Sequence, residues 1–292
     1  MATDTLTPPA QAPDFGPRYD MSRDAVQEVV GSYFTTHELP PGRFVGVVAA
    51  PDEPLANAAR WLEREVFDPT FGNSTKQMQE LYGPVEPDSR FIVVLDEAEK
   101  LPAGVMRVVG GEAAYTMSLA EAPKHIPNVA EDQIKAYHEI TGNEKAWDVA
   151  TMAIAKRYRG KVLGTVAISG ILQYTFVGLG EQEGVELAFA LLDHKARRSL
   201  EGVGVPFKPM YGHDEPFPYY GSGATYAMVG RLPEFRQSVA QRHEELSRES
   251  TLANMFHMGV HKALTRRYVG KVAGMAALGK DGVDKRIVLP TA

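Results

Sequence analysis

The sequence has no cysteine among its 292 residues. This absence excludes disulfides, thiolate nucleophiles and zinc sites built on thiolates. Positive charge is not in excess either, because 31 lysines and arginines face 37 aspartates and glutamates and leave a formal net charge of −6. General nucleic-acid binders are usually basic, so this balance argues against a nucleic-acid partner. The lack of cysteine fits a cytoplasmic protein, which is the location we expect.

One uncharged stretch, residues 162–180, is long enough to cross a bilayer with its 19 residues. Its four glycines, Gln173 and charged flanks favour a buried helix of a globular domain over a membrane span. The first 20 residues contain four prolines and no apolar run. We therefore expect a disordered tail there and no signal peptide.

The pattern of apolar residues predicts an α/β fold, layered in the α+β manner, with one mixed twisted sheet. We divide the chain into a tail (1–20), a domain (21–231) and a helical C-terminal extension (232–292). Strands are expected at 43–50, 90–95, 103–109, 146–155, 185–193 and 224–230. Helices are expected at 24–36, 51–67, 74–82, 129–142, 162–178 and 194–204, and through most of 232–280.

A basic turn, residues 156–164, joins the strand at 146–155 to the uncharged helix. The free N–H groups of a helix's first turn and the helix dipole favour an anion at that point. Fixed positive charge is supplied by Arg157, Arg159 and Lys161. Gly160 and Gly164 have no side chain, so the backbone can approach a bound anion closely at those two positions. The turn therefore predicts a phosphate or pyrophosphate site. A solvated basic helix cap is the alternative, and neither a P-loop nor a GxGxxG fingerprint is present.

At this turn the chain resembles the GCN5-related N-acetyltransferase (GNAT) superfamily, whose turn has the form Arg/Gln-x-x-Gly-x-Gly/Ala. Arg159 and Gly164 fit that form, and Val162 replaces its middle glycine. Residues 147–154 (WDVATMAI) and 104–109 (GVMRVV) look like two strands of the acyl-homoserine-lactone synthases and N-acyl amino acid synthases. Asp148 and Thr151 stand where that branch has Glu and Arg. These departures count against homoserine-lactone formation more than against acyl transfer.

The resemblance implies transfer of an acyl group, expected to be long-chain, from an acyl carrier protein or CoA thioester to a small amine such as an amino acid. No permanently bound cofactor and no metal are expected. The catalytic candidates are Asp148, as the base that takes the amine's proton, and Tyr211, as the donor to the leaving thiolate. Tyr211 is the first choice among the three tyrosines of this region, which also include Tyr219 and Tyr220. The main chain at Met152, Ala153 and Ile154 is expected to hold the donor, with an oxyanion site there if the strand bulges. Substrate contacts are expected at Arg107, Trp147 and Thr151.

The residues leave other interpretations open. Asp148 could be a solvated strand charge, Arg107 a structural ion pair, and Tyr211 part of aromatic packing. The enzyme could instead be an acetyl-CoA-dependent acetyltransferase, or the fold a non-catalytic acyl-ligand binder. Because Val162 narrows the approach to the turn, we expect acyl carrier protein to be preferred over CoA. Its acidic surface would dock at Arg157, Arg159, Lys195, Arg197 and Arg198.

Overall fold

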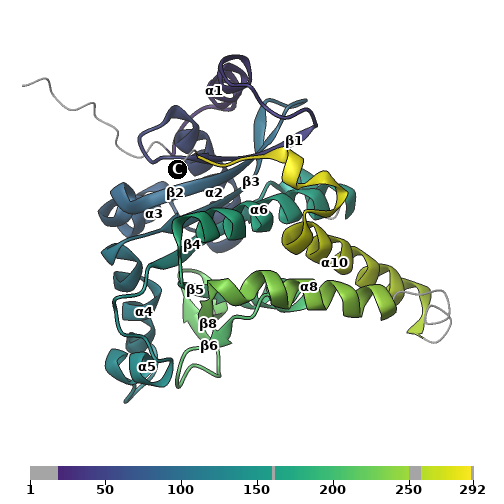
Figure 1. The fold of residues 1–292 in the computed structure, drawn as a ribbon. Helices are drawn as coiled ribbons and strands as arrows, with labels where there is room; N and C mark the ends of the chain where they lie inside the picture. The colour runs from purple at the N-terminus through teal and green to yellow at the C-terminus, as the bar shows by residue number, and fades with distance from the viewer. Residues whose placement is uncertain (1–18, 160–161, 250–257, 291–292) are drawn as a thin grey trace, which may run out of the picture.

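The computed structural model describes residues 19–159, 162–249 and 258–290 (Figure 1). Its strands form a single mixed sheet in the order β6-β8-β5-β4-β3-β2-β1-β9, with β7 paired to β8. The strands are β1 (Phe44–Ala49), β2 (Ser89–Asp96), β3 (Leu101–Val109), β4 (Ala146–Ile154), β5 (Leu187–Asp193), β6 (Lys208–Pro209), β7 (Phe217–Tyr219), β8 (Ser222–Arg231) and β9 (Ile287–Val288). The expected mixed α/β fold is confirmed.

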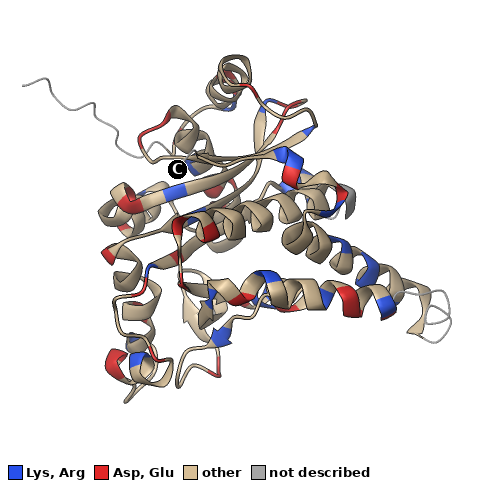
Figure 2. Ribbon diagram, in the orientation of Figure 1, with Lys and Arg blue, Asp and Glu red and all other residues tan. Residues whose placement is uncertain are grey.

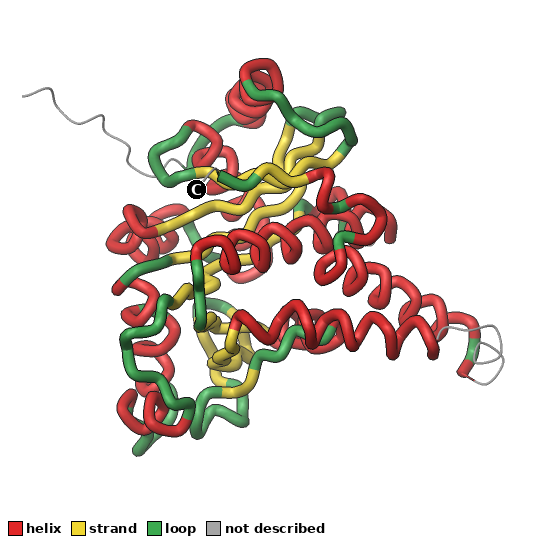
Figure 3. Tube along the Cα trace, in the orientation of Figure 1, coloured by secondary structure: helices red, strands yellow, loops and turns green. Residues whose placement is uncertain are grey.

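Helices cover both faces of the sheet (Figure 3). One face carries α2, which contacts β2, β3 and β4, and the other carries α6, which contacts β1 to β4. The helices are α1 (Arg23–Thr36), α2 (Pro54–Phe71), α3 (Thr75–Tyr82), α4 (Ser118–Glu121), α5 (Glu131–Tyr137), α6 (Val162–Glu183), α7 (His194–Val203), α8 (Leu232–Glu249) and α10 (Val260–Leu278). They match the predicted positions within a few residues, and the short α4 was not expected.

The uncharged helix α6 lies close against the sheet. A Cβ on Gly46 of β1 would stand 2.5 Å from Ile171, and one on Gly104 of β3 would stand 2.5 Å from Ile168. Because real side chains do not approach so closely, glycine at these two strand positions sets the distance between α6 and the sheet. Figure 2 shows acidic residues only near the C-terminal end of α6. Within the described ranges, no helix has the length and apolarity of a membrane span.

The C-terminal helices form a further layer over α6. α10 lies alongside α8 and α6, and Phe235, Val239 and Ala276 belong to the same apolar core as β1 to β4. Beyond α10 the chain returns to the sheet, where β9 pairs in parallel with β1. The sequence did not predict β6, β7 or β9, because strands of two or three residues are too short to show a period.

The expected tail requires one correction. Tyr19 is fully buried, and its hydroxyl accepts a hydrogen bond of 2.7 Å from Arg107 of β3. The ordered domain therefore begins at or before Tyr19, because a buried aromatic ring with a polar partner holds the chain in place. The rest of the expected tail, residues 1–18, lies outside the described residues.

Candidate active site

The parallel strands β4 and β5 pair only at their beginnings, from Ala146 with Leu187 to Asp148 with Phe189. β5 then follows β8 along its whole length, while β4 stays with β3 as far as Ile154. A bulge opposite Arg107 and Val108 interrupts the pairing of β3 with β4. The two strands therefore separate after Asp148, and the edge of β4 that faces β5 has no partner strand among the described residues. This gap is the centre of the candidate site.

The peptide groups of two residues on β4 point into the gap. Ala155 donates its N–H to the carbonyl of Ala103 on β3. Since peptide groups alternate between the two edges of a strand, Ile154 and Met152 turn theirs to the opposite edge. The carbonyl of Ile154 there accepts a 2.8 Å hydrogen bond from Arg159 Nε. Met152 and Ile154 thus lie where a donor could meet the main chain, and the peptide group of Ala153 faces β3.

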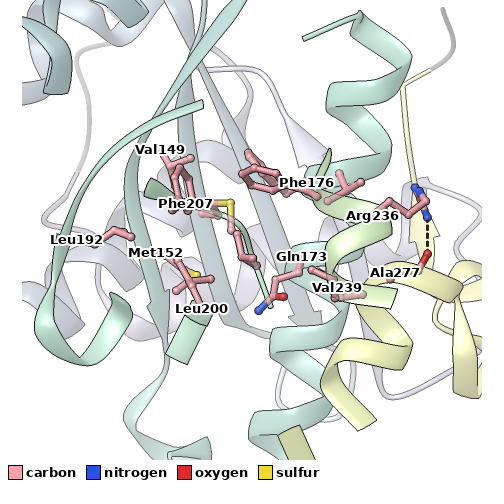
Figure 4. A pocket seen from close by; sticks show the side chains of 15 residues that line it. Val149, Met152, Gln173, Phe176, Leu192, Leu200, Phe207, Arg236, Val239 and Ala277 are labelled. Carbon is pink, nitrogen blue, oxygen red and sulfur yellow. Dashed lines mark hydrogen bonds between the residues drawn. The ribbon is translucent and has the colours of Figure 1, made fainter. Parts of the chain in front are cut away.

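An apolar cavity opens beside the gap on the α6 face (Figure 4). It lies between the separated strands and helices α6, α7 and α8. Representative lining residues are Val149, Met152, Phe176, Leu192, Leu200 and Val239. Trp147 lies on the same face but is only 2% exposed and packs against Phe176, with the two rings tilted and their centroids 5.6 Å apart. Its place is the core, so the expected direct contact of Trp147 with substrate is not supported.

Asp148 lies on the opposite face of the sheet. Its neighbours Trp147 and Val149 face α6, and alternation directs Asp148 toward α4. The side chain is 1% exposed, and its Oδ2 accepts the Ser118 N–H at 2.9 Å. Oδ1 has no hydrogen-bond partner in the described part of the chain. Burial raises the pKa of Asp148 to about 7, against the lowering effect of the hydrogen bonds from Ser118. Such a carboxyl exchanges protons near neutrality.

A tyrosine that the sequence analysis ranked behind Tyr211 lies near Asp148. Tyr219 of β7 is half-buried, and burial together with the charges of Glu121 and Asp148 raises its pKa. Its phenol therefore stays protonated at neutral pH and can donate a proton or a hydrogen bond. Tyr82 lies near Tyr219, and burial and nearby acidic groups raise its pKa as well.

Tyr211, the tyrosine expected from the sequence, has a different environment. Its ring is 42% exposed and lies against Tyr137, with ring centroids 5.1 Å apart. Its N–H hydrogen-bonds with His138 Nε2 at 3.2 Å, close to α5. These contacts support a packing role for Tyr211, whereas the charge of Asp148 contributes to the raised pKa of Tyr219. Which tyrosine faces Asp148 depends on the register of β7, for which the sequence carries no periodic signal.

Arg107 is held inside the protein, and each of its three side-chain nitrogens bonds to a neighbouring residue. The side chain is fully buried, and its Nε and Nη2 bond to the carboxylate of Glu63 at 3.1 and 2.6 Å. Its Nη1 donates to Glu86 at 2.8 Å, and Nη2 also reaches Tyr19. Thr151 is 4% exposed and donates its hydroxyl to Glu63. The expected substrate contacts of Arg107 and Thr151 are therefore wrong, and the structural ion pair is the correct interpretation for Arg107.

The arginines of the basic turn hold the turn against the sheet. Arg157 Nη2 donates to the carbonyl of Pro102 at 2.9 Å, and its guanidinium lies over the ring of Tyr158. Arg159 binds the carbonyl of Ile154, as noted above. A Cβ on Gly164 would meet the same Tyr158 ring at 3.4 Å. The two remaining candidates of the turn, Gly160 and Lys161, lie outside the described residues.

An open pocket adjoins this turn and was not found from the sequence. Besides Gly164 and Tyr158, it is lined by three cations, Arg43, Lys271 and Arg286. Arg43 pairs with the buried Asp96 at 3.0 Å, and Lys271 pairs with Asp281 at 3.4 Å. Arg43 directly precedes β1, and the other two cations come from the C-terminal part of the chain, so no local motif could have placed the three together.

No family model matches the chain, and no curated protein matches it. Several solved structures are similar. One is FeeM, an N-acyl amino acid synthase from uncultured soil microbes, with 14% identity and a TM-score of 0.49 over 67% of this chain and 94% of that chain. Another is a putative N-acetyltransferase from Lactobacillus plantarum, with 16% identity and a TM-score of 0.42 over 65% of this chain and 99% of that one.

A third similar structure is the CoA-dependent acyl-homoserine lactone synthase BjaI, with 10% identity and a TM-score of 0.45 over 69% of this chain and 89% of that one. These are the groups of proteins that the sequence motifs resemble.

Proposed function

We propose that this chain is an N-acyltransferase that moves a long-chain acyl group from a CoA or carrier-protein thioester to a small amine, such as an amino acid. The observation that carries the proposal is the gap between β4 and β5. It has the apolar cavity on one face of the sheet and Asp148, with its pKa near 7, on the other. A thioester carbon held in the gap would place its chain in the cavity and meet the amine on the side of Asp148.

The residues around the gap fit the chemistry of aminolysis. Asp148 accepts the first proton from the ammonium form of the amine. The nitrogen then bonds to the thioester carbon and releases its second proton to solvent as the intermediate collapses. The outward N–H of Met152 stabilises the oxyanion that forms at the thioester oxygen. When the C–S bond breaks, the thiolate takes the phenolic proton of Tyr219, which is restored from solvent. Most of the rate enhancement comes from holding the two substrates together.

The proposal is tested by thiol release from a series of acyl thioesters, with and without added amines. Amine-dependent release from long-chain donors, with the N-acyl product identified by mass spectrometry, supports it. Turnover with acetyl thioesters alone would make the chain an acetyltransferase. Bound lipid without turnover under any condition would make it an acyl-ligand binder. Asp148→Asn serves as the control for release that does not depend on the site.

Tyr219→Phe is expected to lower turnover by about 10²-fold, because the departing thiolate loses its proton donor. The loss should shrink with a donor whose thiol is more acidic, such as an aryl thioester, since that thiolate leaves without protonation. Tyr220→Phe, at the exposed neighbouring position, and Tyr211→Phe should retain near-normal turnover. The measurement is kcat for both donors in all three variants. A loss that is equal for the two donors would contradict the role of Tyr219.

A carrier protein is expected to dock at the start of α7. This helix follows β5 directly and so begins at the open end of the gap, with Lys195 and Arg198 exposed on it. Reversing both charges to glutamate should lower kcat/KM for acyl carrier protein about tenfold at low salt and leave acyl-CoA turnover nearly unchanged.

The matched control reverses Lys76 of α3 and Arg90 of β2, which are exposed elsewhere on the surface. The readout is kcat/KM against ionic strength for each donor, because charge steering weakens as salt is added. If the Lys195 and Arg198 reversal slows both donors equally, or if salt has no effect on the carrier-protein reaction, this docking site is ruled out.

A further inference from the structure

The apolar cavity contains one polar side chain that lacks a partner. Gln173 of α6 is 7% exposed, and its Oε1 is buried without a hydrogen bond to any described residue. Figure 4 shows its amide end turned toward the side of the cavity where Met152 and Leu200 lie. A buried amide without a partner costs about 1–3 kcal/mol, so its presence in an apolar wall calls for an explanation.

The described residues around the cavity provide few hydrogen-bond partners for the Gln173 amide. Arg236 is the only other polar residue among the described residues that line the cavity. Its guanidinium is already engaged, with Nε and Nη2 on Glu181 at 2.8 and 2.6 Å and Nη1 on the carbonyl of Ala277 at 2.8 Å. A trapped water needs two to four polar partners, and this wall supplies one free side chain. A ligand that carries its own polar group into the cavity can supply the missing partner.

We propose that Gln173 selects acyl chains that carry a hydroxyl group. This inference rests on the proposed function, because it takes the cavity as the site of the acyl chain. The hydroxyl donates its O–H to Gln173 Oε1, which is the unpaired atom, and the rest of the chain contacts the apolar wall. An oxo group only accepts hydrogen bonds and cannot satisfy Oε1. The substrate class is thus a hydroxyacyl thioester.

The experiment measures binding, so it needs no transfer reaction. A fluorescent fatty acid bound to the full chain is displaced by saturated fatty acids of one length: unsubstituted, with an oxo group, or with a hydroxyl near the carboxyl, at mid-chain or at the tip. The variants are Gln173→Leu and, as matched control, Gln182→Leu. Gln182 lies on the same helix but is exposed and bonds to the carbonyl of Pro290 at 2.8 Å.

In the natural chain, one of the hydroxylated acids should bind about 2- to 10-fold more tightly than the unsubstituted acid, as expected for one net hydrogen bond. The oxo acid at the same position should show no such gain. Gln173→Leu should reverse the preference, because the hydroxyl then enters a wholly apolar space. Gln182→Leu should keep the preference for the hydroxylated acid. A natural chain that prefers the unsubstituted acid at every hydroxyl position overturns the inference, and so does a preference that persists in Gln173→Leu.

Failure of this inference and failure of the proposed function give different results. Hydroxyl selectivity in binding, with no thiol release from any thioester, would leave the role of Gln173 intact and refute acyl transfer. Amine-dependent turnover without hydroxyl selectivity would refute the role of Gln173 and leave acyl transfer intact. Absence of all fatty-acid binding in a chain that still turns over acetyl thioesters overturns the inference and leaves a short-chain acyltransferase.

Discussion

Replacing Asp148 with asparagine should lower turnover by about 10²–10⁴-fold and leave the chain folded, because asparagine has nearly the same shape but cannot take up the amine's proton. The Ser118 N–H that donates to Asp148 Oδ2 at 2.9 Å keeps an acceptor in the amide oxygen of the variant. We would measure kcat with one acyl donor and a saturating amine. Asp148→Glu should retain more activity than Asp148→Asn, since it restores a carboxylate.

The pH dependence of the rate separates a base from a structural carboxyl. Burial raises the pKa of Asp148 to about 7, so the carboxylate that accepts a proton is present mainly above that pH. Turnover of the natural chain should rise from about pH 6 to pH 8 and then level off. In Asp148→Asn the inflection near pH 7 should disappear, and the residual rate should keep rising with the fraction of neutral amine. An unchanged rate and pH profile in the variant would remove Asp148 from the mechanism.

Asp148→Asn should make the folded chain more stable above neutral pH, although it makes the enzyme less active. A carboxyl whose pKa rises from 3.8 to about 7 on folding favours the native state below pH 3.8, and that contribution is lost as the pH rises to about 7. Above that pH the buried charge opposes folding by several kcal/mol relative to a neutral group. Asp148→Asn should therefore be more resistant to urea at pH 8 than the natural chain, and the two should converge near pH 4. An inactive but stabilised variant excludes misfolding as the cause of lost activity.

Much of the fold follows from local patterns in the sequence. The strand at residues 146–155, the basic turn and the uncharged helix after it were predicted in the right order, because apolar periodicity and chain length are local signals. The same signals placed Asp148 within a strand flanked by apolar residues. Its contact with Ser118 was beyond reach, since 30 positions separate the two residues and the segment between them is poorly patterned.

The predictions that failed at the site concern residues whose contacts are distant in the chain. Arg107 was expected to bind substrate, but the carboxylates that surround it come from α2 and the turn before β2, up to 44 positions away in the chain. Tyr211 was preferred to Tyr219 for a similar reason, because the position of Tyr219 depends on how a three-residue strand pairs with β8. An amino-acid type suggests what chemistry a residue can perform, but tertiary contacts decide whether its polar atoms are free.

Replacing Arg107 with methionine should destabilise the chain by about 3–5 kcal/mol, because it leaves buried carboxylates without their cation. The Glu63 side chain is fully buried and would keep only the hydroxyl of Thr151, whereas Glu86 retains Arg60. Typical domains are stable by about 5–15 kcal/mol, so much of the native state's margin would be lost. The measurement is the free energy of unfolding in urea at neutral pH. Arg90→Met, at an exposed position on β2, is the matched control and should cost little.

A second variant identifies the cause of that loss. Combining Arg107→Met with Glu63→Gln removes the uncompensated charge and should recover part of the lost free energy, because a neutral amide is far less costly to bury than a carboxylate. The alternative role gives a different outcome. If Arg107 bound a substrate carboxylate, Arg107→Met would unfold at the same urea concentration as the natural chain and would raise KM for the amine alone. That result would return Arg107 to the substrate site and leave the buried carboxylates of Glu63 and Glu86 without an explanation.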